Sequence, residues 1–156
     1  MTSDKLALTT CYCNSLRQAS RYLTSFYDQM LSGTGLRVTQ FSILARLLKK
    51  PANVNQLARS MVMDRTTLAR NLQPLVRDEL VAIRPSEQDR RERVIELTER
   101  GRDVVEGALP AWERAQQLFA ERFGPAEVEQ MRDMMSEVVA SGVHELLGKP
   151  ATSVED

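Results

Sequence analysis

The residues best suited to chemistry form a cluster of basic and small polar side chains near the middle of the chain. On one predicted helix they are Arg65, Thr66, Thr67, Arg70 and Asn71. An arginine can donate two hydrogen bonds to a guanine edge, an asparagine can pair with an adenine edge, and a threonine can reach a phosphate or a thymine methyl. The cluster therefore indicates contact with duplex DNA, although an ordinary solvated helix face would have a similar composition.

A second basic cluster lies in the polar stretch from residue 85 to residue 92 and just beyond it. Its five central residues are Asp89-Arg90-Arg91-Glu92-Arg93. The flanking segments 80–84 and 93–97 alternate or are rich in β-branched residues, which predicts a β-hairpin with the arginines at its tip. Arginines there suit a narrow, electronegative minor groove. We expect Asp89 to hold a neighbouring arginine through a charge-assisted pair.

Apolar spacing predicts the helices that position these clusters. The capping-box pair Asn53 and Gln56 opens a short helix, and a turn at 61–64 leads into a helix capped by Asp64. Two helices joined by a short turn, the second polar and basic near its start, are typical of a helix-turn-helix. Pro74 lies within the second helix and removes one backbone hydrogen bond, so we expect a kink or an early tightening of the helix there.

Longer helices are predicted on either side of this unit. From Leu8 onward, apolar residues recur every three or four positions until two glycines at 33 and 35, and Thr39 is the expected N-cap of the next helix. Two further helices are predicted over 99–123 and from Pro125 to about residue 147. The expected fold class is mainly α with a small β-hairpin wing.

Composition argues against several classes of protein. The chain has 156 residues, 42% hydrophobic and 27% charged, and no apolar run approaches the roughly 18 residues of a membrane span. Its first residues lack the features of a signal peptide, so we expect a cytoplasmic protein. One histidine, His144, and two cysteines provide no zinc cluster and no convergent nucleophile and base. We therefore expect no metal, no cofactor and no enzymatic activity.

The net charge of zero hides an uneven distribution. Residues 37–103 hold 14 lysines and arginines against 9 acidic residues, whereas residues 104–156 hold 4 against 10. A basic segment of this kind is typical of a surface that meets a polyanion such as DNA.

Two motifs resemble those of the MarR family of bacterial transcription regulators. Asp89-Arg90-Arg91 followed by Leu97-Thr98-Glu99-Arg100-Gly101 is similar to the family pattern D-x-R…L-T-x-x-G, and Asp64-Arg-Thr-Thr-Leu-Ala-Arg70 resembles the start of its recognition helix. The resemblance spans about residues 6 to 147. The expected organisation is an N-terminal dimerisation helix over 6–32, a winged helix-turn-helix DNA-binding domain over 36–100, C-terminal dimerisation helices over 101–147 and a disordered tail over 148–156.

The resemblance implies an obligate homodimer, and the sequence supports this independently. The amphipathic helices on either side are too long for the small winged domain to cover their apolar faces. The function we expect is that of a sequence-specific DNA-binding regulator, a dimeric repressor released from a pseudo-palindromic operator by a small effector. An alternative is a winged-helix module for protein–protein contact, whose basic loop would meet an acidic partner.

The resemblance also implies a small aromatic or amphipathic effector, bound between the dimerisation helices and the winged domain. The side chains that could line such a crevice are Tyr12, Tyr22, Phe26, Phe41 and Trp112, with Arg17 or Arg21 for an anionic group. Each aromatic residue would equally suit packing in an ordinary core.

Cys11 and Cys13 are the residues least explained by packing. On one continuous helix their side chains would point about 200° apart, so they could neither share a core nor readily bond to each other. Three interpretations stay open, namely inert cysteines, a thiol-based redox sensor, and a site for a thiophilic metal or metalloid.

Overall fold

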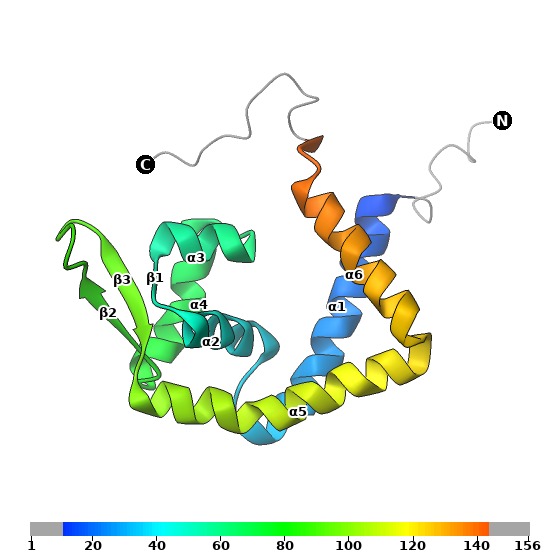
Figure 1. Ribbon diagram of the computed structural model, residues 1–156, viewed down its shortest axis with the longest axis horizontal. Coiled ribbons are helices and arrows are strands. Elements are labelled where there is room, and N and C mark those ends of the chain that lie inside the picture. The colour runs from blue at the N-terminus through cyan, green and yellow to red at the C-terminus, as the bar shows by residue number, and fades with distance from the viewer. Residues whose placement is uncertain (1–10, 144–156) are drawn as a thin grey trace. The chain divides into compact units, whose positions relative to one another are not determined.

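The computed structural model describes residues 11–143, and Figure 1 shows their path. Contacts divide the chain into two compact units, one ending at Ala115 and the other starting at Gln116. The first holds α1 (Tyr12–Leu31), the short 3-10 helix η2 (Ser32–Thr34), three further helices, three strands and most of α5. The predicted fold class is confirmed, because the chain is mainly helical with one small antiparallel sheet.

The start of α2 (Val38–Lys49) differs from the sequence prediction. The N-cap predicted at Thr39 is wrong, because the helix already includes Val38. The Val38 N–H donates to Asp28 Oδ1 at 2.7 Å, so a carboxylate on α1 satisfies the first turn of α2. Local spacing could not reveal this cap, since the acceptor lies ten residues upstream.

The helix-turn-helix consists of α3 (Val54–Met61) and α4 (Arg65–Arg77), and both predicted caps are confirmed. Asn53 Oδ1 accepts the Gln56 N–H at 2.8 Å, and Gln56 Oε1 accepts the Asn53 N–H at 3.2 Å. Asp64 Oδ1 accepts the Thr67 N–H at 2.7 Å. The helix α4 continues past Pro74, and its buried side chains are Leu68, Leu72 and Leu75.

The predicted hairpin is present, as β2 (Val81–Pro85) and β3 (Arg93–Leu97), paired from Val81↔Leu97 to Pro85↔Arg93. A third strand, β1 (Ala52–Asn53), pairs with the other edge of β3, which gives the order β1-β3-β2. Two residues are too few to show the alternation by which strands are recognised, so the sequence did not predict β1.

A single apolar core joins α2, α3, α4, the sheet and the beginning of α5 (Glu99–Phe123). Its most deeply buried large side chains are Leu31, Ile43, Leu44, Leu57, Leu68, Leu75, Ile95 and Val105. Because α4 and the strands of the wing contribute side chains to this core, burial of apolar surface fixes their positions within the first unit. In Figure 1 the hairpin leaves the end of α4 and projects beyond the helices.

A tight joint connects α5 to the end of α4. Thr98 Oγ1 donates to the Glu79 carbonyl oxygen at 2.6 Å and accepts the Gly101 N–H at 2.9 Å. A Cβ on Gly101 would overlap the carbonyl oxygen of Leu80. The L-T-x-x-G motif is therefore explained structurally, because threonine caps α5 and glycine allows the backbones to meet.

The second unit holds the end of α5 and α6 (Pro125–Ala140), which begins with proline at its first position as predicted. The predicted end near residue 147 is wrong, because α6 ends at Ala140 and Gly142 has a left-handed backbone with φ 62°. None of the unit's residues between 116 and 143 is buried, and the large apolar side chains that α6 exposes are Met134, Met135, Val138 and Val139. His144 and the predicted tail lie outside the described residues. Between residues 11 and 143 no helix is long and apolar enough to cross a membrane.

Candidate nucleic-acid interface

The outer face of α4 carries the basic and polar side chains that the sequence singled out. Its leucines turn into the core, which leaves Thr66 and Arg70, four positions apart, on the opposite face. Arg65 is exposed beside them. Neither guanidinium has a hydrogen-bonding or ionic partner among residues 11–143, so the donors of both are available to an external acceptor.

Thr67 and Asn71, also predicted to contact DNA, bond to the helix itself. The Thr67 hydroxyl donates to Asp64 Oδ2 at 2.7 Å, and Asn71 Nδ2 donates to the Thr67 carbonyl oxygen at 2.8 Å. The bonds from the Thr67 backbone and then from its hydroxyl hold the pKa of the Asp64 carboxyl below its ordinary value. These contacts give both residues a part in stabilising the first turns of α4.

Two further polar side chains share the outer face of α4 but were not among the predicted residues. Gln73 and Arg77 follow Thr66 by seven and eleven positions, a spacing that keeps them on the same side of a helix. Arg77 is engaged by Asp78, with Nε–Oδ1 at 2.8 Å and Nη2–Oδ2 at 3.3 Å. The hydrogen bond from Arg77 lowers the pKa of the Asp78 carboxyl. Helical spacing alone could have identified both residues.

The wing presents Arg90 and Arg91 in the loop between β2 and β3. Both side chains are exposed and have no internal partner in the part of the chain that the structure describes. The hairpin beneath them is braced by an ion pair from Arg84 Nε to Glu96 Oε1 at 2.9 Å. The two arginines are therefore held on an ordered support and remain available to phosphate or to a groove.

Asp89 acts differently from the sequence prediction. Its Oδ1 accepts the backbone N–H of Arg91 at 2.9 Å, and no ion pair from Asp89 to an arginine side chain occurs among the described residues. The expected pairing with a guanidinium is therefore corrected. The physical reason is that aspartate readily bonds to a backbone N–H two residues ahead, which closes a tight turn. Asp89 thus shapes the backbone that carries Arg91.

The predicted ligand-contacting residues do not come together within the first unit. Phe41 is 3% exposed and stacks on Trp112, with ring centroids 5.8 Å apart, so this pair contributes to the core. Tyr12 and Tyr22 are 87% and 78% exposed and lie ten residues apart on α1, about 15 Å along its axis. Phe26 makes an edge contact with Tyr27, and Arg17 is exposed on the same helix.

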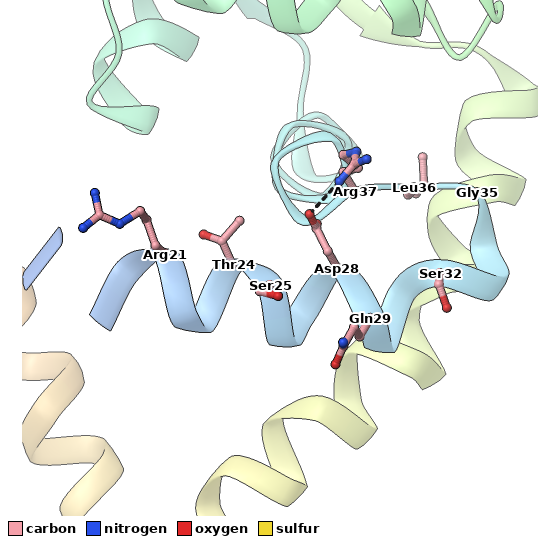
Figure 2. Close-up of a pocket in the computed structure, with 9 residues that line it drawn as sticks. All are labelled: Arg21, Thr24, Ser25, Asp28, Gln29, Ser32, Gly35, Leu36 and Arg37. Carbon is pink, nitrogen blue, oxygen red and sulfur yellow. Dashed lines mark hydrogen bonds and ion pairs between the residues drawn. The ribbon is translucent and has the colours of Figure 1, made fainter. Parts of the chain in front are cut away.

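A hollow of about 630 Å³, lined mostly by polar residues, lies instead against α1 and the segment before α2 (Figure 2). Of the seven residues named for the predicted ligand site, Arg21 lines this hollow and the other six do not. Across the hollow, Arg37 Nη1 pairs with Asp28 Oδ2 at 3.1 Å. The full lining is Arg21, Thr24, Ser25, Asp28, Gln29, Ser32, Gly35, Leu36 and Arg37.

Cys11 and Cys13 are both exposed at the beginning of α1. Cys11 has extended backbone with φ −73° and ψ 112°, and the helix begins at Tyr12. The expectation that one helix runs through both cysteines is therefore wrong, although Leu8 itself lies outside the described residues. Among residues 11–143 no three histidine, cysteine or acidic side chains are grouped as metal ligands.

Comparison with known proteins agrees with this geometry. The MarR family model matches residues 34–92, which cover α2 to α4 and most of the wing. The HTH-type transcriptional repressor NicR of Pseudomonas putida is 28% identical over 104 residues, just under two thirds (66%) of either chain.

Solved structures extend the match over most of the chain. The M. tuberculosis transcriptional regulator MOSR, in complex with DNA, is 33% identical with a TM-score of 0.78, covering 86% of this chain and 97% of MOSR. A probable transcriptional regulator from Pseudomonas aeruginosa is 26% identical with a TM-score of 0.74, covering 84% of this chain and 98% of its own. The resemblance indicated by the wing and recognition-helix motifs is confirmed, and the chain belongs to the MarR family of DNA-binding transcription regulators.

Proposed function

We propose that the protein is a dimeric repressor that places α4 in the major groove of a pseudo-palindromic operator and the wing in the adjacent minor groove. The observation that carries this proposal is a set of outward guanidinium groups, on a capped helix and on a hairpin, that have no partner within residues 11–143. The direct contacts we assign are Arg65, Thr66, Arg70, Arg90 and Arg91, supported by Thr67, Asn71 and Asp89. Repression is supported by the similarity to NicR, which is named a repressor. Such a protein acts in the bacterial cytoplasm.

The homodimer is supported by apolar side chains that a single chain leaves exposed. On α6 they include Met134, 67% exposed, and Val139, 65% exposed, and on α1 Leu16 is 45% exposed. Apolar area of this kind at regular helical spacing is stabilised when a second copy covers it.

The test is selection of bound genomic fragments by the purified full chain, followed by titration of the selected site with salt. We expect a pseudo-palindrome, and affinity that falls steeply and log-linearly with salt, because each neutralised phosphate releases counterions. Arg91→Ala should weaken binding to all sequences and make the salt dependence less steep by about one unit. A module for protein–protein contact would show neither a selected site nor this dependence.

We further propose that the effector is a small anion that enters the hollow beside α1. Its volume is within the range of ligand pockets, and Arg21, with no partner among the described residues, projects from α1 at its wall (Figure 2). Aromatic carboxylates and their neutral amides, matched in shape, provide the test in an operator-release assay. We expect release by carboxylates alone, lost in Arg21→Ala and retained in Arg17→Ala, whose side chain is one turn away and outside the hollow.

The exposure of both thiols favours a second candidate, thiol-dependent release from DNA. Free cysteines are usually buried, so two exposed ones are not explained by packing. Peroxide or arsenite is added at low equivalents to the parent and to the Cys11→Ser, Cys13→Ser double variant. Release of the parent alone supports this candidate, and equal binding of both proteins supports inert cysteines.

A further inference from the structure

We propose that Gln73 reads a base in the operator, a role that the sequence alone assigns to Asn71. The inference rests on the proposed function, since it requires α4 to lie in a major groove. It concerns which side chains on α4 reach the groove floor, and three observations carry it: the geometry of the helix face, the bonds already made by neighbouring residues, and the chemistry of the glutamine amide.

The first observation is the position of Gln73 around the helix. Thr66, Arg70 and Gln73 occupy positions i, i+4 and i+7, so they form one line on the face opposite the buried leucines. Asn71 follows Arg70 directly and is therefore rotated by about 100° from it. A helix that presents Arg70 to the groove presents Gln73 with it, and turns Asn71 to one side.

The second observation is which amide groups are already bonded. Asn71 is partly buried and its Nδ2 donates to the Thr67 carbonyl oxygen at 2.8 Å. Gln73 is exposed, and its amide has no partner among residues 11–143. The bond to Thr67 uses one N–H of the Asn71 amide and holds that side chain along the helix, whereas both N–H groups and the oxygen of Gln73 are available to a base.

Arg77 is the next residue along the line formed by Thr66, Arg70 and Gln73. It lies on the same face, but its guanidinium is held by Asp78 through two contacts. Among the described residues, the last polar side chain on this face of α4 that has no partner is therefore Gln73, one residue before Pro74.

The third observation is the chemistry of the amide. A glutamine amide offers one donor and one acceptor in a plane, which matches the N7 acceptor and N6 donor of adenine in the major groove. Because the group is uncharged, its contact releases no counterions. The contact of Gln73 should therefore appear as a base preference, whereas the contacts of the arginines with phosphate appear in the salt dependence.

The experiment compares the parent, Gln73→Ala and Asn71→Ala by selecting bound duplexes from a randomised library and then measuring affinities for single-base variants of the selected operator. For Gln73→Ala we expect the preference for adenine at one position in each half-site to fall by about 5- to 150-fold, with an unchanged salt slope. Asn71→Ala removes a bond within α4, so we expect weaker binding to all sequences but the same selected sequence as for the parent. Alanine is a good helix former and Gln73 is exposed, so the variant should fold, which circular dichroism verifies.

Each other outcome counts against the inference. If Gln73→Ala selects the parent's sequence, Gln73 reads no base, while the proposed function stands. A loss in Gln73→Ala that is uniform over all sequences makes Gln73 a phosphate contact, and a loss of base preference confined to Asn71→Ala returns the reading role to Asn71. A parent that selects no sequence at all overturns the proposed function and this inference together.

Discussion

Gly101 allows the backbone of α5 to lie against the Leu80 carbonyl, and a methyl group there has no space. We expect Gly101→Ala to lower the free energy of unfolding by about 1–3 kcal/mol, because the neighbouring atoms are backbone and cannot rotate away. Urea unfolding at fixed protein concentration measures the change. Gly107→Ala is the matched control on the same helix, since nothing lies within 4 Å of its added Cβ, and it should be neutral or stabilising by up to about 1 kcal/mol.

Asp64 makes the stability of α4 dependent on pH. Its pKa is lowered in the folded chain, so its contribution is present above the pKa of the unfolded chain and is lost as pH falls through the folded pKa. We expect Asp64→Asn, which retains a capping oxygen, to flatten the acid side of the curve of unfolding free energy against pH. The same curve in both proteins would show that Asp64 contributes no pH dependence.

At the residue scale, what the sequence could predict was set by distance along the chain. The caps by Asp64 and Asn53 join residues three apart, and local spacing identified both. The contact of Asp89 with the Arg91 N–H also spans only two residues, but the choice between that N–H and a guanidinium depends on the turn geometry. The prediction that Asn71 contacts a base took no account of its bond to Thr67, which engages one N–H of the amide.

Asp28 couples two elements, since one carboxylate bonds to the N–H of Val38 and pairs with Arg37. We expect Asp28→Ala to cost about 0.5–2 kcal/mol of unfolding free energy, as loss of a helix cap does. Asp28→Asn should cost less, because it keeps an oxygen for Val38. Chemical denaturation compares them with Glu106→Ala, which removes only an exposed ion pair to Arg102 at 3.9 Å and should change stability by less than about 0.5 kcal/mol. Equal losses in all three variants would contradict a capping role for Asp28.

At the element scale, long amphipathic segments were predictable and short or non-local ones were not. The helix predicted over 99–123 occurs with those bounds, because apolar residues recur at helical spacing over 25 residues and do not alternate as in a strand. The strand β1 exists only because β3 provides a partner far away in sequence. The start of α2 likewise depends on a side chain from another helix.

At the scale of the whole molecule, a two-fold dimer has two copies of α4. We expect the operator to contain two inverted half-sites whose centres lie about one helical turn, roughly 10 bp, apart. Footprinting on operators with base pairs inserted between the half-sites tests this spacing. An insertion of half a helical turn should abolish tight binding, and an insertion of a full turn should restore only part of the affinity. Tight binding of a monomer to a single half-site would contradict the dimer.

The candidate ligand site is where sequence reasoning was least complete. The resemblance to the MarR family implied a crevice that aromatic side chains could line, but Phe41 and Trp112 stack on each other as part of the core. The hollow is lined by polar residues of one face of α1 together with residues after η2. In the sequence, polar residues at this spacing cannot be distinguished from the solvent-exposed face of an ordinary amphipathic helix.

The joint at Thr98 and Gly101 has a mechanical consequence. The Thr98 hydroxyl bonds both to the Glu79 carbonyl oxygen and to the Gly101 N–H, and the backbone of Gly101 lies directly against the Leu80 carbonyl. There is no free volume between the two segments that would let one shift past the other. A displacement of one of these segments is therefore passed on to the other. We therefore expect the first turns of α5 and the residues that follow α4 to be displaced together, so that a change in the tilt of α5 would also shift α4.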